Sequence, residues 1–150
     1  MFKKLTLVFL AAFTLSAADS FVGTWKANMA RSKYSPGPAL RSSTVTYTQD
    51  GDWIVSTIAQ IDSEGKPATA ENRYKRDGKE YPFTRPAGDK GMIAMRSVNA
   101  TTTEATLKIG AATTITRNVM AGDGKSFTRT TTGTDTKGQK VKNVVVFEKQ

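Results

Sequence analysis

The chain has 150 residues, with 22 Lys and Arg against 13 Asp and Glu, and it contains neither cysteine nor histidine. This length fits one domain of ordinary size. The missing residue types exclude disulfides, thiol nucleophiles, Ser-His-Asp triads, and metal sites built from thiolate or imidazole ligands. We therefore expect that the protein is not an enzyme and that it uses no metal and no cofactor. The remaining alternative is an enzyme that uses only Asp, Glu, Lys, Tyr or Arg.

The first 18 residues have the features of a secretory signal peptide. Lys3 and Lys4 precede an apolar run over residues 5–15, which is too short to span a bilayer as a helix, and small residues follow at 16–18. Cleavage would start a single mature domain, 19–150, at Asp19. The net charge would fall from +9 to +7, because Lys3 and Lys4 are removed and no acidic residue is. We predict an exported protein, periplasmic or secreted, that is soluble and has no transmembrane segment.

The mature chain is predicted to be all-β. Four of the six leucines lie in the signal segment, whereas Thr, Val and Ile are abundant after it, and β-branched side chains favour strands. The apolar period of two predicts strands, in chain order, near residues 21–27, 44–48, 53–61, 70–75, 93–97, 104–109, 112–120, 125–133 and 139–149.

Short turns rich in Asp and Gly separate these strands, as at Asp50-Gly51, Asp77-Gly78 and Asp135–Gly138. Such residues supply the positive φ angles that tight hairpins need. Eight to ten strands joined in this way form an antiparallel meander, and closure into an up-and-down β-barrel removes its two bare edges. The one long irregular stretch is 29–40.

The first strand contains a Gly-x-Trp motif, in FVGTWK at 21–26, and this resembles lipocalins and lipocalin-like domains. With GTWKANMARSKYSPGP at 23–38, TVTY at 44–47, DGKEYP at 77–82 and VKNVVVFEKQ at 141–150, the chain is similar to small exported bacterial lipocalin-like proteins over nearly all of its mature length. The resemblance implies a β-barrel with room for an interior cavity, and no activity is established for that bacterial group. It also implies that Gly23 and Trp25 form a structural plug at one barrel end, with Arg117 or Arg129 packed on Trp25.

Two arginines in the late strands are candidates for ligand binding. Arg117 shares a strand face with Ile115, and Arg129 shares one with Phe127. If the apolar residues face inward, one or both guanidiniums point into the barrel. A buried guanidinium needs an anionic partner, and a fatty acid would supply one. The alternatives are packing on Trp25, an internal carboxylate, or a reversed strand face that leaves the arginine in water.

Aromatic and basic side chains complete the set of candidates. Tyr47, Trp53, Tyr74 and Phe127 are candidates to line a pocket, with an ordinary core as the alternative, and Tyr34 and Tyr81 are candidates for its rim. The densest basic cluster is expected to be a solvated hairpin; it comprises Arg73, Lys75, Arg76 and Lys79.

The leading prediction is therefore a non-enzymatic exported barrel that binds a small apolar or amphipathic ligand in its interior. Apolar burial would drive binding, and an inward Arg or a Tyr would hold the head group. The alternative is an envelope interaction module that binds a protein, as an inhibitor does, or an anionic polymer, through the outer surface or the 29–40 loop. We expect a monomer that binds no nucleic acid.

Overall fold

The computed structural model describes residues 19–150, so the predicted signal peptide lies outside the described residues. The described chain forms ten β-strands and no helix, and accordingly it offers no helix of the length and hydropathy that crossing a membrane requires. The strands are β1 (Gly23–Lys33), β2 (Ser42–Asp50), β3 (Trp53–Ile61), β4 (Pro67–Lys75), β5 (Asp77–Thr84), β6 (Lys90–Asn99), β7 (Thr102–Ile109), β8 (Ala112–Met120), β9 (Ser126–Thr134) and β10 (Lys140–Lys149).

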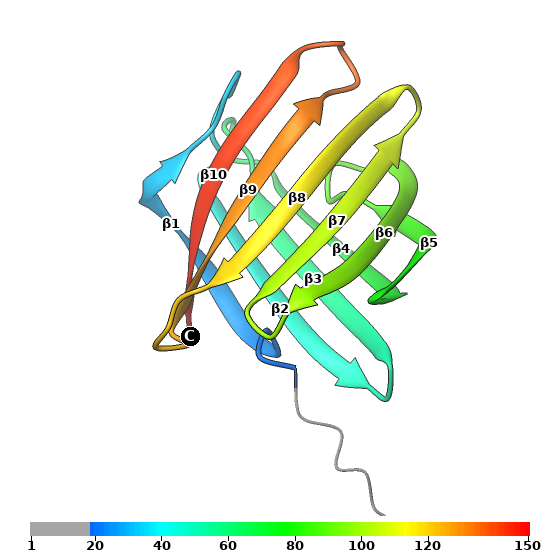
Figure 1. Ribbon diagram of the computed structural model, residues 1–150. Helices are drawn as coiled ribbons and strands as arrows, with labels where there is room; N and C mark the ends of the chain where they lie inside the picture. Colours follow the sequence, from blue (N-terminus) through cyan, green and yellow to red (C-terminus); the bar gives the residue numbers. More distant parts are fainter. Residues whose placement is uncertain (1–18) are drawn as a thin grey trace, which may run out of the picture.

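All ten strands belong to one antiparallel sheet in the order β4-β3-β2-β1-β10-β9-β8-β7-β6-β5. Neighbours in sequence are neighbours in space, except that β1 pairs with β10 and joins the two ends of the chain. Figure 1 shows the resulting barrel, with β6–β10 in front of β1–β4. The predicted all-β up-and-down barrel is confirmed, and it is nearly closed, because β4 and β5 are the two ends of the sheet order.

The side chain of Asn72 links the two edge strands. Asn72, in β4, is buried. Its Nδ2 donates to the carbonyl oxygen of Thr84 at 3.0 Å, and its Oδ1 accepts from the Thr84 N–H at 2.7 Å. The amide thus makes the pair of hydrogen bonds that a strand residue would make in an antiparallel ladder. Asn72 thereby anchors the last residue of β5 across the gap.

Two stretches of the chain differ from the sequence prediction. β5 was not predicted, because Pro82 and several charged residues hide its pattern, and the expected Asp77-Gly78 turn is instead the start of this strand. Proline is tolerated there because β5 is an edge strand, which pairs only with β6. β1 continues to Lys33 with a register shift after Asn28, so the irregular stretch is 34–41 rather than 29–40.

The core fills one end of the barrel, here called the closed end. Four aromatic side chains from three strands and the segment before β1 pack there, all of them buried: Phe21, Trp25, Phe127 and Phe147. The Phe127 ring stacks on Phe147 with centroids 4.9 Å apart, and it meets Trp25 edge to face at 5.1 Å. Such aromatic pairs add to the stabilisation from apolar burial. Beyond this cluster, the barrel interior contains further buried side chains and a cavity.

Candidate ligand-binding cavity

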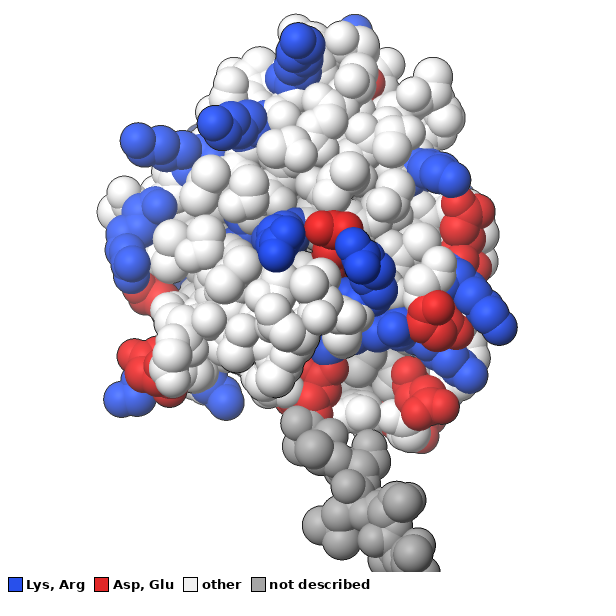
Figure 2. Space-filling model, in the orientation of Figure 1, with Lys and Arg blue, Asp and Glu red and all other residues white. Residues whose placement is uncertain are grey.

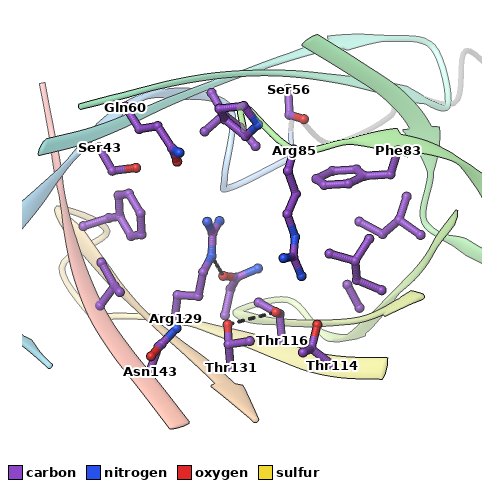
Figure 3. Close-up of a pocket in the computed structure, with 18 of the residues that line it drawn as sticks. Ser43, Ser56, Gln60, Phe83, Arg85, Thr114, Thr116, Arg129, Thr131 and Asn143 are labelled. Carbon is purple, nitrogen blue, oxygen red and sulfur yellow. Dashed lines mark hydrogen bonds between the residues drawn. The ribbon is translucent and has the colours of Figure 1, made fainter. Parts of the chain in front are cut away.

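The unfilled part of the interior is a cavity of about 400 Å³, a size typical of small-molecule sites. Its wall is partly apolar, with Phe83, Ile93, Met95, Leu107 and Phe147 among the lining residues. Figure 3 shows many of the lining side chains directed at the same space. The polar ones among the lining residues are Tyr34, Ser43, Tyr47, Ser56, Gln60, Tyr74, Arg85, Asp89, Thr114, Thr116, Asn118, Arg129, Thr131 and Asn143.

Arg129 is the charged group at the inner part of this cavity. Its Nε donates to Asn118 Oδ1 at 2.9 Å, and its Nη2 donates to the Tyr47 hydroxyl oxygen at 2.6 Å. The guanidinium also lies 4.8 Å from the centroid of the Phe147 ring, a cation–π distance. All these partners are neutral, and no carboxylate in residues 19–150 forms an ion pair with Arg129. A guanidinium has five N–H donors, so Arg129 retains donors for a further partner.

Tyr74 and Ser56 form a second polar part of the wall. The Tyr74 side chain is almost completely buried. Burial is the main cause that raises the pKa of Tyr74 far above its usual range, the neighbouring Tyr47 adds to the rise, and the Ser56 hydroxyl and Arg129 oppose it. The Ser56 hydroxyl lies near Tyr74 and acts to lower its pKa. The Ser56 Oγ atom is buried and has no hydrogen-bond partner within the described chain. Tyr74 therefore stays neutral and keeps its O–H.

The rim of the cavity carries a second guanidinium. Arg85 directly follows β5, and Figure 3 shows its side chain extending into the cavity. Its nearest carboxylate is Asp89, at 4.0 Å, and 32% of the Arg85 side chain is exposed. Tyr34 and Leu40, from the stretch 34–41, line the same cavity, and burial raises the pKa of Tyr34.

Gly23, Trp25 and Phe127 lie at the closed end and outside the cavity wall. Trp25 is fully buried, and its Nε1 donates to the carbonyl oxygen of Phe21 at 2.8 Å. The cation above its indole is the Lys149 ammonium, at 5.5 Å. The expectation that Arg117 or Arg129 packs on Trp25 is therefore wrong. Phe127 packs behind the wall against Phe147, so it supports the cavity rather than lining it.

Arg117 lies on the outer surface, contrary to the expectation for its strand face. In β8 the residues that face inward are Thr114, Thr116 and Asn118, whereas Ile115 and Val119 are 46% and 43% exposed. Ile115 and Val119 thus face outward, and Arg117 lies on the same outer face. Its guanidinium lies 3.7 Å from the carboxylate of Glu104, and Arg117 does not line the cavity.

Trp53 also lies outside the cavity, at the start of β3. Its ring meets Tyr81 edge to face at 5.4 Å, and the cations of Arg73 and Lys75 lie 4.8 Å and 4.9 Å from it. Of the predicted lining residues, the structure therefore brings Arg129, Tyr47 and Tyr74 together and leaves Trp53, Phe127 and Arg117 elsewhere.

Sequence reasoning missed two groups that line the cavity. Thr116 and Asn118 lie on the same face of β8 as Ala112 and Met120. The apolar residues at the two ends of this face were a usable signal that its polar residues also point inward. Arg85 sits in a turn, where no periodicity indicates direction, so nothing in the sequence singled it out.

Most of the titratable groups that line the cavity are hydroxyls and guanidiniums. These groups are three tyrosines, two arginines and the rim carboxylate of Asp89. General acid–base hydrolysis by paired carboxylates needs two such groups facing one substrate, and the lining residues contain one. Within residues 19–150, no three Asp or Glu side chains cluster in a way that would hold a metal ion.

Comparisons by sequence and by structure differ in outcome. No protein-family model and no curated protein matches the sequence. Solved structures do match. A Schistosoma mansoni fatty acid binding protein in complex with arachidonic acid has a TM-score of 0.65 at 17% identity over 87% of this chain and 96% of that chain. Fatty-acid-binding protein 1 of Echinococcus granulosus has a TM-score of 0.64 at 15% identity over 87% and 97%.

A zebrafish ileal bile acid-binding protein complexed with cholic acid also matches, with a TM-score of 0.53 at 15% identity over 87% of this chain and 99% of that chain. At these identities the likeness establishes the fold: residues 19–150 form a barrel of the fatty-acid-binding-protein type. The predicted lipocalin-like barrel is thus confirmed as a coarse description of the architecture.

Proposed function

We propose that this protein is a non-enzymatic, exported binding protein that holds a small amphipathic molecule in its barrel, with an acidic head group on Arg129. The observation that carries the proposal is the state of Arg129. Its guanidinium lies inside a cavity and hydrogen-bonds only the neutral oxygens of Asn118 and Tyr47. A partly buried cation is costly without an anionic partner, and a carboxylate that enters the cavity is such a partner.

The rest of the wall suits the remainder of such a ligand. Charge-assisted hydrogen bonds contribute about 1.5–3 kcal/mol, and each apolar carbon buried against Ile93, Met95 or Leu107 contributes further free energy, at about 25 cal/mol per Å². Arachidonic acid and cholic acid, found in two structures with this fold, are both carboxylic acids with large apolar parts. The shared fold and the free guanidinium support the same class of ligand.

Isothermal titration calorimetry with a long-chain fatty acid and with the alcohol of equal chain length tests the proposal. We expect the acid to bind more tightly by about tenfold or more, because only the acid pairs with Arg129. Native mass spectrometry of gently purified protein is expected to show a copurified small molecule. Equal binding of acid and alcohol, or no binding of either, contradicts the proposal.

Export is part of the proposal and has its own test. Cleavage before Asp19 is compatible with the contacts of that residue, because its backbone nitrogen donates to Gln49 Oε1 at 3.2 Å, which an α-ammonium group also does. N-terminal sequencing of the protein from its natural host is expected to begin at Asp19. A chain that retains residues 1–18 contradicts export by cleavage.

The second candidate function is an interaction module that uses the outer surface. Figure 2 shows uncharged areas on the face formed by β6–β10, on either side of a group of Lys, Arg, Asp and Glu side chains near its middle. Ile115 and Val119 are exposed on this face. These features favour a protein partner over an anionic polymer. Pull-down from an envelope extract at low and high salt separates the two, because binding to a polyanion weakens as salt rises.

A further inference from the structure

We propose that the cavity is built for a ligand with two separate acidic groups on one apolar body, one group at Arg129 and the other at Arg85. This inference rests on the proposed function, since it names the ligand class of the same cavity. The juxtaposition that motivates it is shown in Figure 3, where the two guanidiniums enter the cavity from opposite walls.

The charges that line the cavity are unbalanced. Two guanidiniums face one carboxylate, that of Asp89, which lies 4.0 Å from Arg85 and is 48% exposed. An ion pair of this length and exposure contributes little. Neither arginine therefore has a strong anionic partner among the described residues. A ligand with one acidic group would neutralise one of them and leave the other inside the cavity.

The backbone at Arg85 is anchored on both sides. The N–H of Arg85 donates to the carbonyl oxygen of Asp89, and the N–H of Gly88 donates to the carbonyl oxygen of Arg85, both at 2.8 Å. The preceding residue, Thr84, is held by the two hydrogen bonds from the buried Asn72 side chain. The ordered turn fixes the backbone from which the Arg85 side chain extends, so this segment loses little freedom when a ligand binds.

The two guanidiniums belong to side chains that come from opposite walls of the cavity (Figure 3). Arg129 is fixed against Phe147, which belongs to the aromatic cluster of the closed end. Arg85 leaves the end of β5 at the rim. Apolar side chains such as Ile93 and Leu107 line the same cavity. This arrangement fits an apolar body with an acid at each end better than it fits a single large anion.

The test compares an α,ω-dicarboxylic acid with the monocarboxylic acid of equal chain length, by displacement of anilinonaphthalene sulfonate from the full processed protein. We expect the diacid to bind about tenfold or more tightly, because it gains a second charge-assisted pair. Arg85→Met is expected to remove that advantage, so that the variant binds diacid and monoacid with the same affinity. Asp89→Asn is expected to increase diacid affinity up to a few-fold, because it removes the carboxylate that competes for Arg85. Circular dichroism establishes that each variant is folded.

The outcomes separate this inference from the function on which it rests. If wild-type protein binds monoacid and diacid equally, or if Arg85→Met weakens both equally, the two-acid inference is overturned and the proposed function stands. If neither acid displaces the probe, the proposed function itself fails. A monoalkyl phosphate provides the third arm. Equal gains from phosphate and diacid, both lost in Arg85→Met, would show that the two arginines converge on one head group, and this also overturns the inference.

Discussion

The closed end and the cavity each contain a guanidinium stacked on an aromatic ring, but only one of the two is neutralised by this chain. Arg76 lies 5.4 Å from the centroid of Phe21 and forms an ion pair with Asp19, and both side chains of the pair are 13% exposed. Arg129 lies 4.8 Å from the centroid of Phe147 and has only neutral hydrogen-bond partners. The comparison distinguishes a structural arginine, whose anion is built in, from an arginine whose anion must come from outside.

Burial acts differently on the two sites as well. Burial lowers the pKa of Arg76 to about 10, and its Nε is a buried donor without a hydrogen-bond partner in the described chain. Asp19 therefore compensates a cation that the surroundings solvate poorly. The cavity side of Arg129, in contrast, is open space lined by donors and acceptors. The following predictions test this difference, from the largest expected effect to the smallest.

Asp19→Asn is expected to lower the free energy of unfolding by about 3 kcal/mol, because it leaves Arg76 buried without a counter-ion. Asparagine keeps the oxygen that accepts from the Phe21 N–H at 2.8 Å, so the change isolates the charge. Urea denaturation measures the effect. The matched control is Asp89→Asn, whose exposed pair with Arg85 is expected to contribute less than about 1 kcal/mol. Equal effects of the two variants would remove the distinction between the two ends.

Arg129→Met is expected to weaken fatty-acid binding by about 10- to 100-fold, because the acid loses its charge-assisted hydrogen bonds. The same variant is expected to be at least as stable as wild type, since it removes a cation that has no anionic partner in the described chain. The control is Arg117→Met, on the outer face of the adjacent strand, which is expected to leave affinity unchanged. Calorimetry and urea denaturation give both quantities, and a loss of stability without a loss of affinity would make Arg129 structural.

Alkaline pH is expected to destabilise the protein through Tyr74. Because the folded-state pKa of Tyr74 is raised above 10, the unfolded chain loses this proton first, and stability falls as pH rises above 10. One proton corresponds to about 1.4 kcal/mol per pH unit. Arg76, with its lowered pKa, contributes with the opposite sign between its folded-state and unfolded values, so the measurement is the difference between wild type and Tyr74→Phe.

In Tyr74→Phe the decline of stability above pH 10 is expected to be shallower by about one proton, while Arg76 contributes equally to both proteins and cancels. The control is the same comparison below about pH 9, where Tyr74 is protonated in both the folded and the unfolded chain, so the two proteins are expected to show the same slope. Urea denaturation at a series of alkaline pH values measures the slopes. Identical slopes above pH 10 for wild type and Tyr74→Phe would show that Tyr74 ionises within the folded protein.

Tyr47→Phe is expected to weaken fatty-acid binding by a smaller factor, about two- to tenfold. The hydroxyl of Tyr47 accepts from Arg129 and so positions the guanidinium. Tyr81→Phe is the control and is expected to have little effect, because the Tyr81 ring packs against Trp53 outside the cavity. If Tyr47→Phe equals Arg129→Met in its effect, Tyr47 touches the ligand directly rather than through Arg129.

Much of the fold was predictable because strand alternation is local. In β4 the alternate residues Ala70, Asn72 and Tyr74 are buried, and Glu71 and Arg73 are exposed, which is the alternation that a period of two predicts. β5 was missed because its pairing with β6 alone, at the edge of the sheet, allows a proline that a central strand would exclude. That edge position is a property of the closed sheet and leaves no local signal.

By itself, the sequence determined the all-β class, the positions of most strands and turns, and the two candidate faces of every strand. Only the tertiary structure decided which face of β8 points inward. Ile115 and Val119 make one face apolar, but the interior there is a cavity, and its wall takes Thr114, Thr116 and Asn118 instead. Alternation defines two faces, and the choice between them depends on what the neighbouring strands place inside.

The same reason separates the arginines. Arg117 and Arg129 were equivalent candidates in the sequence, but they lie on opposite faces of two paired strands. Arg117 forms an ion pair on the outer surface. Arg129 is the only cation on the inner face of β9. Arg76 forms an ion pair with Asp19, which lies 57 positions earlier in the chain. Arg85 extends into the cavity from a turn, where no alternation of residues predicts its direction. Which guanidinium is neutralised and which remains available is decided by contacts between distant segments, and these form only when the barrel closes.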